Sequence, residues 1–166
     1  HFDGHLVGQY FKKRCNSVKT IEGKIVDCSI TQSGDVESVT LDSGQVVNSD
    51  FFIDATGFSR ILPKKMGIEW ESYSKYLPVN TAMPFLLEHK EGFRIDPVTV
   101  AYAQKSGWMW MVPTQERMGC GYVFDSHYTD REGAQKEIET LLGQEIKPIK
   151  FIDFDTGKLK EVWKNN

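Results

Sequence analysis

The chain has 166 residues, of which 40% are hydrophobic and 26% are charged, so it can bury one substantial core or two small ones. The net charge of −3 argues against a nucleic-acid partner, and no apolar run is long enough to cross a membrane. The three cysteines lack CxxC and Cys/His metal spacing, which predicts reduced thiols in the cytoplasm and no metal site.

The first expected element is an amphipathic helix at the beginning of the chain. Its apolar residues recur at helical spacing: Phe2, Leu6, Val7, Tyr10, Phe11 and Cys15. Asp3 can cap the helix, and the basic residues 12–14 complement the C-terminal end of its dipole. We expect the apolar side of this helix to pack on another part of the protein.

Three short strands are expected next, at residues 25–31, 36–41 and 45–47. The segments between them, residues 33–35 and 42–44, consist of the Ser, Gly and Asp that form turns. This pattern predicts an antiparallel three-stranded meander.

Residues 50–57, with the sequence DFFIDATG, form an apolar run that ends in small residues and a glycine. Such a run is typical of a buried strand in a parallel sheet, and ligands gather at the carboxyl ends of these strands. Asp54, Ala55, Thr56 and Gly57 would then let the backbone approach a dinucleotide closely, because Gly57 has no side chain. An ordinary strand followed by a turn would look the same, so both interpretations stay open.

After a short helix and a loop within residues 60–76, the chain is expected to form an antiparallel sheet. Its four β segments fall at residues 79–87, 98–104, 107–112 and 119–125. The turns between them fall at residues 91–92, 105–107 and 115–117.

The third of these strands carries two tryptophans on alternate positions. Side chains alternate between the faces of a strand, so Trp108 and Trp110 should share one face while Met109 and Met111 share the other. Pro113 lacks an N–H for the ladder and should end the strand. The tryptophans are either two large core residues or an aromatic wall beside a flat cofactor or aromatic substrate.

A helix is expected at about residues 130–142. Residues 129–132 have the form of a capping box, and Gly143 can end the helix. Two further strands are expected at residues 149–154 and 159–163.

Three stretches together resemble the flavin-dependent halogenases of the tryptophan halogenase family. They are residues 1–7 (HFDGHLV), residues 52–57 (FIDATG), and residues 107–113 (GWMWMVP) running into residues 121–128 (GYVFDSHY). The first two also occur in the wider class of flavin monooxygenases, and the third narrows the resemblance. Its pattern Trp-x-Trp-x-Ile-Pro is matched except that Val112 stands in place of isoleucine.

The resemblance implies an α/β (α+β) fold of the p-hydroxybenzoate hydroxylase type. Residues 1–60 would be the later part of an FAD-binding domain, with the helix, the meander and a parallel strand. Residues 61–166 would form an antiparallel substrate-side sheet. The residues implied in contacts with FAD are Val26, at the adenine end, and Asp54, Ala55, Thr56 and Gly57. The residues implied in a wall between flavin and substrate are Trp108, Trp110 and Pro113.

The chain also departs from the family pattern. It has no GxGxxG, since residues 119–121 supply only a GxG in a strand-like setting, so the pyrophosphate loop is expected before His1. No lysine or glutamate here matches the catalytic pair of the family, so no catalytic residue is assigned. The chain is therefore expected to be an internal fragment that binds FAD weakly or not at all and is inactive by itself.

For the parent protein, the resemblance implies halogenation of an electron-rich aromatic such as an indole, with reduced FAD, oxygen and halide. A separate flavin reductase would supply the reduced FAD, and a homodimer is possible. Two alternatives stay open: a flavin monooxygenase that hydroxylates its substrate, and a non-catalytic module that binds aromatic compounds.

Overall fold

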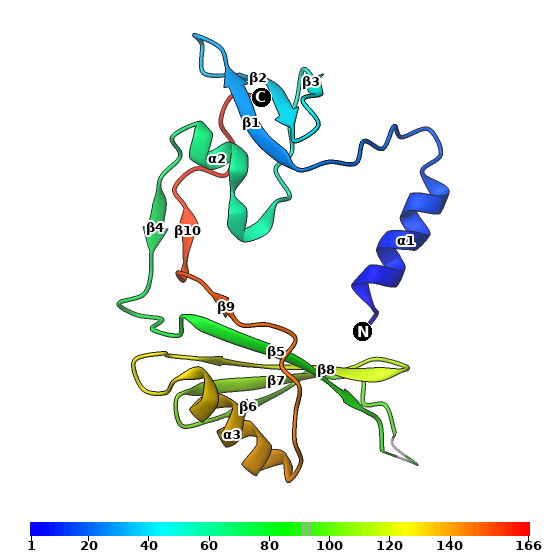
Figure 1. Ribbon diagram of the computed structural model, residues 1–166, viewed down its shortest axis with the longest axis vertical. Coiled ribbons are helices and arrows are strands. Elements are labelled where there is room, and N and C mark those ends of the chain that lie inside the picture. Colours follow the sequence, from blue (N-terminus) through cyan, green and yellow to red (C-terminus); the bar gives the residue numbers. More distant parts are fainter. Residues whose placement is uncertain (91, 93) are drawn as a thin grey trace. The chain divides into compact units, whose positions relative to one another are not determined.

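The computed structural model describes residues 1–90, 92 and 94–166, so the predicted turn at residues 91–92 includes Glu91, which lies outside the described residues. The chain forms two compact units (Figure 1). The first unit contains residues 1–16 and 73–156, and the second contains residues 17–72 and 157–166. These units are groups of residues that contact one another within this chain. The predicted division at residue 60 concerns the domains of the whole cofactor-binding protein, and it stays a prediction.

The first unit is built on one antiparallel sheet with the strand order β6-β7-β8-β5-β9. Its strands are β6 (Val100–Ala103), β7 (Gly107–Pro113), β8 (Arg117–Phe124), β5 (Thr81–Glu88) and β9 (Ile152–Asp153). The predicted four-stranded antiparallel sheet is confirmed. The strand predicted at residues 149–154 is shorter, because its ladder with β5 includes only two residue pairs.

A proline lies in the middle of β5 without breaking the sheet. Pro84 is paired with Gly121 of β8, and its carbonyl accepts a hydrogen bond of 2.8 Å from the N–H of Ile149. The carbonyl and nitrogen of one strand residue point to the same side, so the nitrogen of Pro84 faces away from β8. The ladder between β5 and β8 therefore needs no N–H from this residue.

Helix α3 (Arg131–Leu142) covers one face of this sheet (Figure 1). The residues buried between them include Met83, Phe85, Met109, Tyr122, Phe124, Ala134 and Ile138. Asp130 caps the helix by accepting a hydrogen bond of 2.7 Å from the N–H of Gly133. The predicted cap at residue 129 was therefore one position early. Gly143 ends the helix at a φ of 66°, as predicted.

Two buried weak acids in this core, the Tyr122 hydroxyl and the Cys120 thiol, should make the protein less stable at alkaline pH. Burial raises the pKa of Tyr122 to about 12 from 10.0, and the pKa of the Cys120 thiol to about 12 from 9.0. The Tyr122 hydroxyl also donates to the Glu137 carboxylate at 3.1 Å and accepts from the N–H of Ser106 at 3.2 Å. Both groups therefore bind their protons more tightly in the folded state.

A raised folded pKa stabilises the protein below the unfolded pKa, and this stabilisation is lost as pH rises through the folded pKa. We expect the free energy of unfolding to fall between pH 9.0 and about 12, by on the order of 2 kcal/mol. Urea unfolding at several pH values would measure this fall. Tyr122→Phe removes one of the two groups, so its curve should fall less steeply above pH 10.0. Identical curves would contradict the assignment.

The second unit contains the predicted meander. Its strands are β1 (Ile25–Ile30), β2 (Val36–Leu41) and β3 (Val46–Asn48), paired antiparallel in that order. The other elements are η1 (Gly57–Ser59), α2 (Ile61–Lys65), β4 (Trp70–Ser72) and β10 (Gly157–Leu159). Its core forms around Cys28, Val36, Val39 and Leu62. Strand β10 lies earlier than the strand predicted at residues 159–163, because it pairs antiparallel with β4.

The last residues of the chain hold two segments of this unit together. The side-chain amide of Asn166 accepts from the N–H of Val36 and donates to its carbonyl, both at 2.8 Å. The same amide donates to the carbonyl of Asp50 at 3.3 Å, and the ring of Trp163 lies edge-on to Phe51 at 5.5 Å. Residues 163–166 therefore hold the start of β2 beside the segment that follows β3.

Residues 51–54, within the predicted strand of the DFFIDATG run, form no strand in this chain, and the parallel strand expected of the whole protein stays a prediction. Residues 51–56 pair with no strand among the described residues, and Ile53 is 84% exposed. A strand needs a hydrogen-bonded neighbour, and the apolar run alone does not supply one.

Helix α1 (Gly4–Arg14) begins as predicted, because Asp3 accepts hydrogen bonds from the N–H groups of His5 at 2.9 Å and Leu6 at 3.2 Å. The apolar side of this helix is not covered by other parts of this chain, so its expected packing stays a prediction for the whole protein. No residue of α1, all of which are described, is buried, and the preceding Phe2 is 74% exposed. The helix contacts the sheet by polar side chains at its beginning, where Asp3 forms an ion pair with Arg117.

Candidate functional site

The two tryptophans of β7 lie on one face of the sheet, as predicted. Their ring centroids are 6.1 Å apart and their planes are tilted by 57°. Met109, between them, is fully buried on the opposite face against the α3 core, whereas Trp108 is 43% exposed. Strand β7 ends at Pro113, also as predicted. The indoles therefore do not belong to the core under α3, which favours the wall over two core residues.

The strands beside β7 carry mostly small residues opposite the indoles. Trp108 is paired with Ala103 of β6 and Val123 of β8. Trp110 is paired with Ala101 and Gly121. Directly opposed residues in an antiparallel sheet share a face, so these side chains border the indoles. We call Trp108, Trp110 and these four neighbours the indole face.

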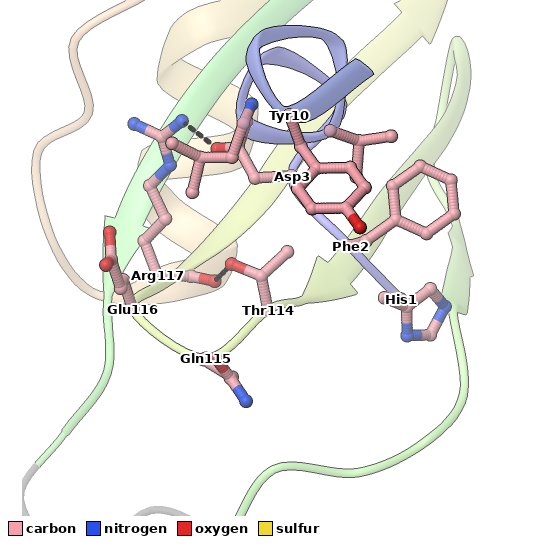
Figure 2. Close-up of a pocket in the computed structure, with 10 residues that line it drawn as sticks. His1, Phe2, Asp3, Tyr10, Thr114, Gln115, Glu116 and Arg117 are labelled. Carbon is pink, nitrogen blue, oxygen red and sulfur yellow. Dashed lines mark hydrogen bonds and ion pairs between the residues drawn. The ribbon is translucent and has the colours of Figure 1, made fainter. Parts of the chain in front are cut away.

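The hairpin turn after Pro113 contacts the beginning of α1. A cavity of about 390 Å³ lies there, lined by residues 1–3, 6, 7 and 10 and by residues 114–117 (Figure 2). Arg117 donates to the Asp3 carboxylate at 2.8 Å, and the hydroxyl of Thr114 donates to the carbonyl of Arg117 at 2.7 Å. The hairpin that carries the tryptophans is thus tied to the helix cap within the first unit.

The turn at residues 54–57 is organised by two side chains. The Asp54 carboxylate accepts from the N–H of Thr56 at 2.7 Å and from the N–H of Leu62 at 2.8 Å. The Thr56 hydroxyl accepts from the N–H of Ile61 at 3.2 Å. Burial acts to raise the pKa of Asp54, but hydrogen bonds from Thr56 and Leu62 outweigh it and hold the pKa below its usual value. Asp54 is therefore an ionised cap for α2.

The same turn presents backbone to solvent. Ala55 and Gly57 are exposed, and Gly57 has a φ of 61°, which favours glycine. No described atom lies within 4 Å of a Cβ added to Gly57. The turn therefore has the open backbone that close approach of a dinucleotide requires.

Val26 is the extra residue of a β-bulge. Ile25 is paired with Leu41 and Asp27 with Thr40, so Val26 has no partner across the ladder. A bulged residue leaves backbone groups outside the ladder, and the side chain of Val26 is exposed. This position therefore fits a backbone contact with an adenine ring. Val26 and residues 54–57 belong to the second unit, whereas Trp108, Trp110 and Pro113 belong to the first.

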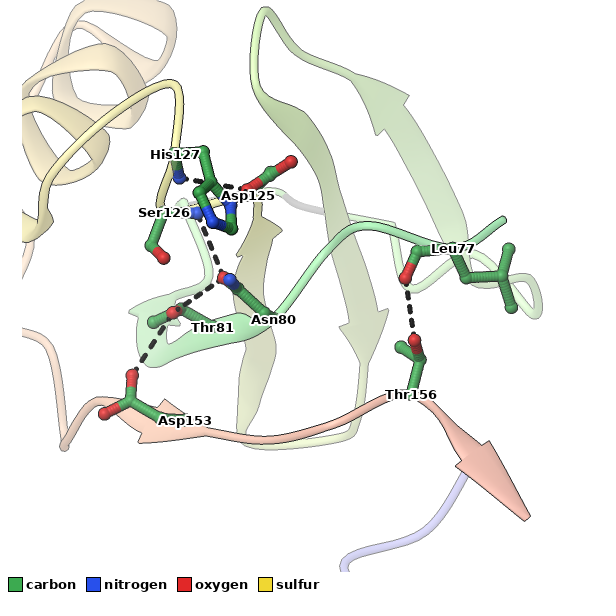
Figure 3. Close-up of polar contacts among 8 residues, drawn as sticks. All are labelled: Leu77, Asn80, Thr81, Asp125, Ser126, His127, Asp153 and Thr156. Carbon is green, nitrogen blue, oxygen red and sulfur yellow. Dashed lines mark hydrogen bonds and ion pairs between the residues drawn. The ribbon is translucent and has the colours of Figure 1, made fainter. Parts of the chain in front are cut away.

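A further polar cluster lies at the end of β8 (Figure 3). Asn80 accepts from the N–H of Ser126 at 3.0 Å and from the hydroxyl of Thr81 at 3.2 Å. Asp125 contacts the ring of His127 at 2.6 Å, and the Thr81 hydroxyl also contacts Asp153 at 3.2 Å. These contacts join the ends of three strands, so we assign the cluster a structural role.

Sequence reasoning missed the contacts that shape both parts of the site. The Arg60 guanidinium lies 4.0 Å from the ring centroid of Trp70, and Arg60 has a φ of 47°, which nothing in its residue type predicts. In the sequence, Gly121 stood out only as part of an incomplete GxGxxG. A glycine inside a strand can, however, mark a place where another group lies close to the backbone. Within the described residues, no group of three or more His, Cys, Asp or Glu could hold a metal, and no helix could span a membrane.

The whole chain, residues 1–166, matches the family model described as tryptophan halogenase. It is 30% identical over 173 residues to tryptophan 7-halogenase RebH of Lentzea aerocolonigenes, with 100% of this chain and 33% of that protein covered. The solved structure of tryptophan 6-halogenase SttH from Streptomyces toxytricini is similar with a TM-score of 0.91 at 26% identity, covering 100% of this chain and 34% of that one. The solved structure of the flavin-dependent halogenase BrvH from Brevundimonas sp. BAL3 is similar with a TM-score of 0.89 at 27% identity. The match covers 100% of this chain and 35% of that one. The chain thus spans about a third of the length of the relatives it matches.

Proposed function

The chain belongs to the tryptophan halogenase family, and we propose that it forms about one third of a flavin-dependent halogenase. The observation that carries this proposal is the strand GWMWMVP, whose two indoles share a face outside the α3 core and whose ladder ends at Pro113. We expect the catalytic lysine and glutamate of the family in other segments of the whole protein, because no residue of this chain matches them.

In the proposed enzyme, the second unit contributes part of the FAD site. Reduced FAD, when bound, would supply the activation of oxygen that halide oxidation requires. The open backbone at Gly57 lets the cofactor approach, and Asp54 holds the turn in place by capping α2. The unpaired backbone of Val26 is available to the adenine.

The first unit contributes the wall beside the substrate. Trp108 and Trp110 exclude water and separate an electron-rich aromatic, such as an indole, from the cofactor. This separation favours oxidation of chloride or bromide over direct hydroxylation. A separate flavin reductase, a homodimer and a cytoplasmic location belong to the same proposal.

Turnover of the whole protein tests this function. Reduced FAD, oxygen and chloride or bromide are supplied with tryptophan, indole and phenol as trial substrates. We expect a halogenated product that depends on the halide. A hydroxylated product with no halogenated one would overturn the proposal in favour of a monooxygenase. Absence of both products and of FAD binding in the whole protein would favour the non-catalytic module.

Titration of the 166-residue chain with FAD is a separate test of where the cofactor is held. A dinucleotide gains much of its affinity from backbone N–H groups around the pyrophosphate, and the chain has no GxGxxG to supply them. We therefore expect weak or undetectable binding by the chain. Binding at one site per chain with a micromolar or lower Kd corresponds to a binding free energy of about −8 kcal/mol. That result would contradict the expectation that FAD is held mainly by a pyrophosphate loop outside this chain.

A further inference from the structure

We propose that Gly121 is a positioning residue that sets the orientation of the Trp110 indole, and that the shape of the indole face depends on this glycine. The effect on halogenation rests on the proposed function. The orientation itself does not, because it concerns only side chains of the first unit.

The indole of Trp110 occupies the space that any side chain at residue 121 would need. A Cβ added to Gly121 would lie 2.0 Å from Cη2, 2.1 Å from Cζ2 and 2.7 Å from Cζ3 of Trp110. Real Cβ atoms do not approach other carbons this closely. The six-membered ring of the indole therefore lies directly on the backbone of Gly121, and only glycine permits this position.

The strand register explains why this contact forms on β8. Trp110 stands directly opposite Gly121, whereas its neighbour Trp108 stands opposite Val123, which is buried. The surface of β8 therefore has a depression at Gly121 and a side chain at Val123. Trp110 turns into the depression, and the two indoles reach their separation of 6.1 Å and tilt of 57°.

A second glycine on the same strand supplies a matched control. Gly119 precedes Gly121 by two residues, so both positions face the same side of β8. The nearest described atom to a Cβ added to Gly119 is the carbonyl oxygen of Val112 at 3.8 Å, which is an ordinary contact. Trp110 therefore requires glycine at 121, and nothing comparable requires it at 119.

Circular dichroism of the 166-residue chain tests the orientation directly. Two indoles at this distance and tilt couple their electronic transitions and produce an exciton couplet, which Trp108→Phe should abolish. We expect Gly121→Ala to lower the couplet amplitude by at least about half, because Trp110 must leave its place to avoid a clash. Gly119→Ala should leave the amplitude unchanged. An unchanged couplet in Gly121→Ala would overturn the proposal.

A double-mutant cycle tests the contact through stability. Gly121→Ala should lower the folding equilibrium constant roughly tenfold to a hundredfold, which is the usual range for overpacking. In a Trp110→Ala background the same change should cost less than about threefold, because the clashing ring is gone. If Gly121→Ala alone does not fold, recovery of folding in the double variant supports the proposal. Equal losses in both backgrounds would overturn it.

The link to the reaction is tested in the whole protein. Gly121→Ala should lower the yield of halogenated product per flavin oxidised at least about threefold, whereas Gly119→Ala should retain the wild-type yield. An unchanged yield with an altered couplet would overturn the role in the reaction. If the wild-type whole protein forms no halogenated product, the proposed function fails while the orientation is still decided by the couplet and the cycle.

Discussion

Replacing Phe124 by alanine should lower the free energy of unfolding by about 3–5 kcal/mol, the largest loss we expect from a single substitution in this chain. Phe124 is fully buried, and its ring centroid lies 5.3 Å from that of Tyr122 in the core between α3 and the sheet. Truncation leaves a cavity that the surrounding strands cannot fill, because both Tyr122 and Ile138 are held by their own neighbours. Urea unfolding of the purified chain measures the loss.

The same substitution at Phe2 is the matched control. Phe2 belongs to the same unit but is 74% exposed, so Phe2→Ala should cost less than about 1 kcal/mol. A similar loss for both variants would contradict the placement of the core under α3.

Replacing Asp54 by alanine should cost about 2–3 kcal/mol, because the N–H groups of Thr56 and Leu62 each lose their acceptor. The expected loss is measured by urea unfolding near neutral pH. The pKa of Asp54 is lowered in the folded state, so its contribution is present above its ordinary value of 3.8 and is lost as pH falls through the folded pKa. Asp54→Asn should therefore flatten the acid limb of the stability curve.

Asp50→Ala removes an exposed carboxylate four residues earlier and should change the stability by less than about 0.5 kcal/mol. If Asp54→Ala were equally mild, Asp54 would not be the cap that orders this turn. The open backbone at Gly57 would then need another explanation.

Features that depend on local geometry were predictable from the sequence. The shared face of Trp108 and Trp110 follows from the two-residue period of a strand, and the helix cap at Asp3 follows from its short acidic side chain. The resemblance of three stretches to one family was equally local, and the family match over the whole chain confirms it.

Features that depend on distant partners were not predictable. Residues 51–54 have the composition of a strand, but a strand exists only where another segment supplies hydrogen bonds. The apolar side of α1 predicted packing that the structure does not show. The contact between Trp110 and Gly121 required the register of β7 against β8, which no single segment contains.

The alternation of the chain between its two units has a consequence for synthesis on the ribosome. The meander strands emerge early, but the residues that complete their unit, from β10 to Asn166, are translated only after the whole sheet of the first unit. Pairing of β4 with β10 must therefore close a loop of more than 80 residues, from Ser72 to Gly157. By this order the first unit, whose last residue is Thr156, can fold before the second unit is complete. Until then the early meander lacks the pairing of β4 with β10 and the hydrogen bonds from Asn166, so in the nascent chain it is exposed to chaperones and to aggregation.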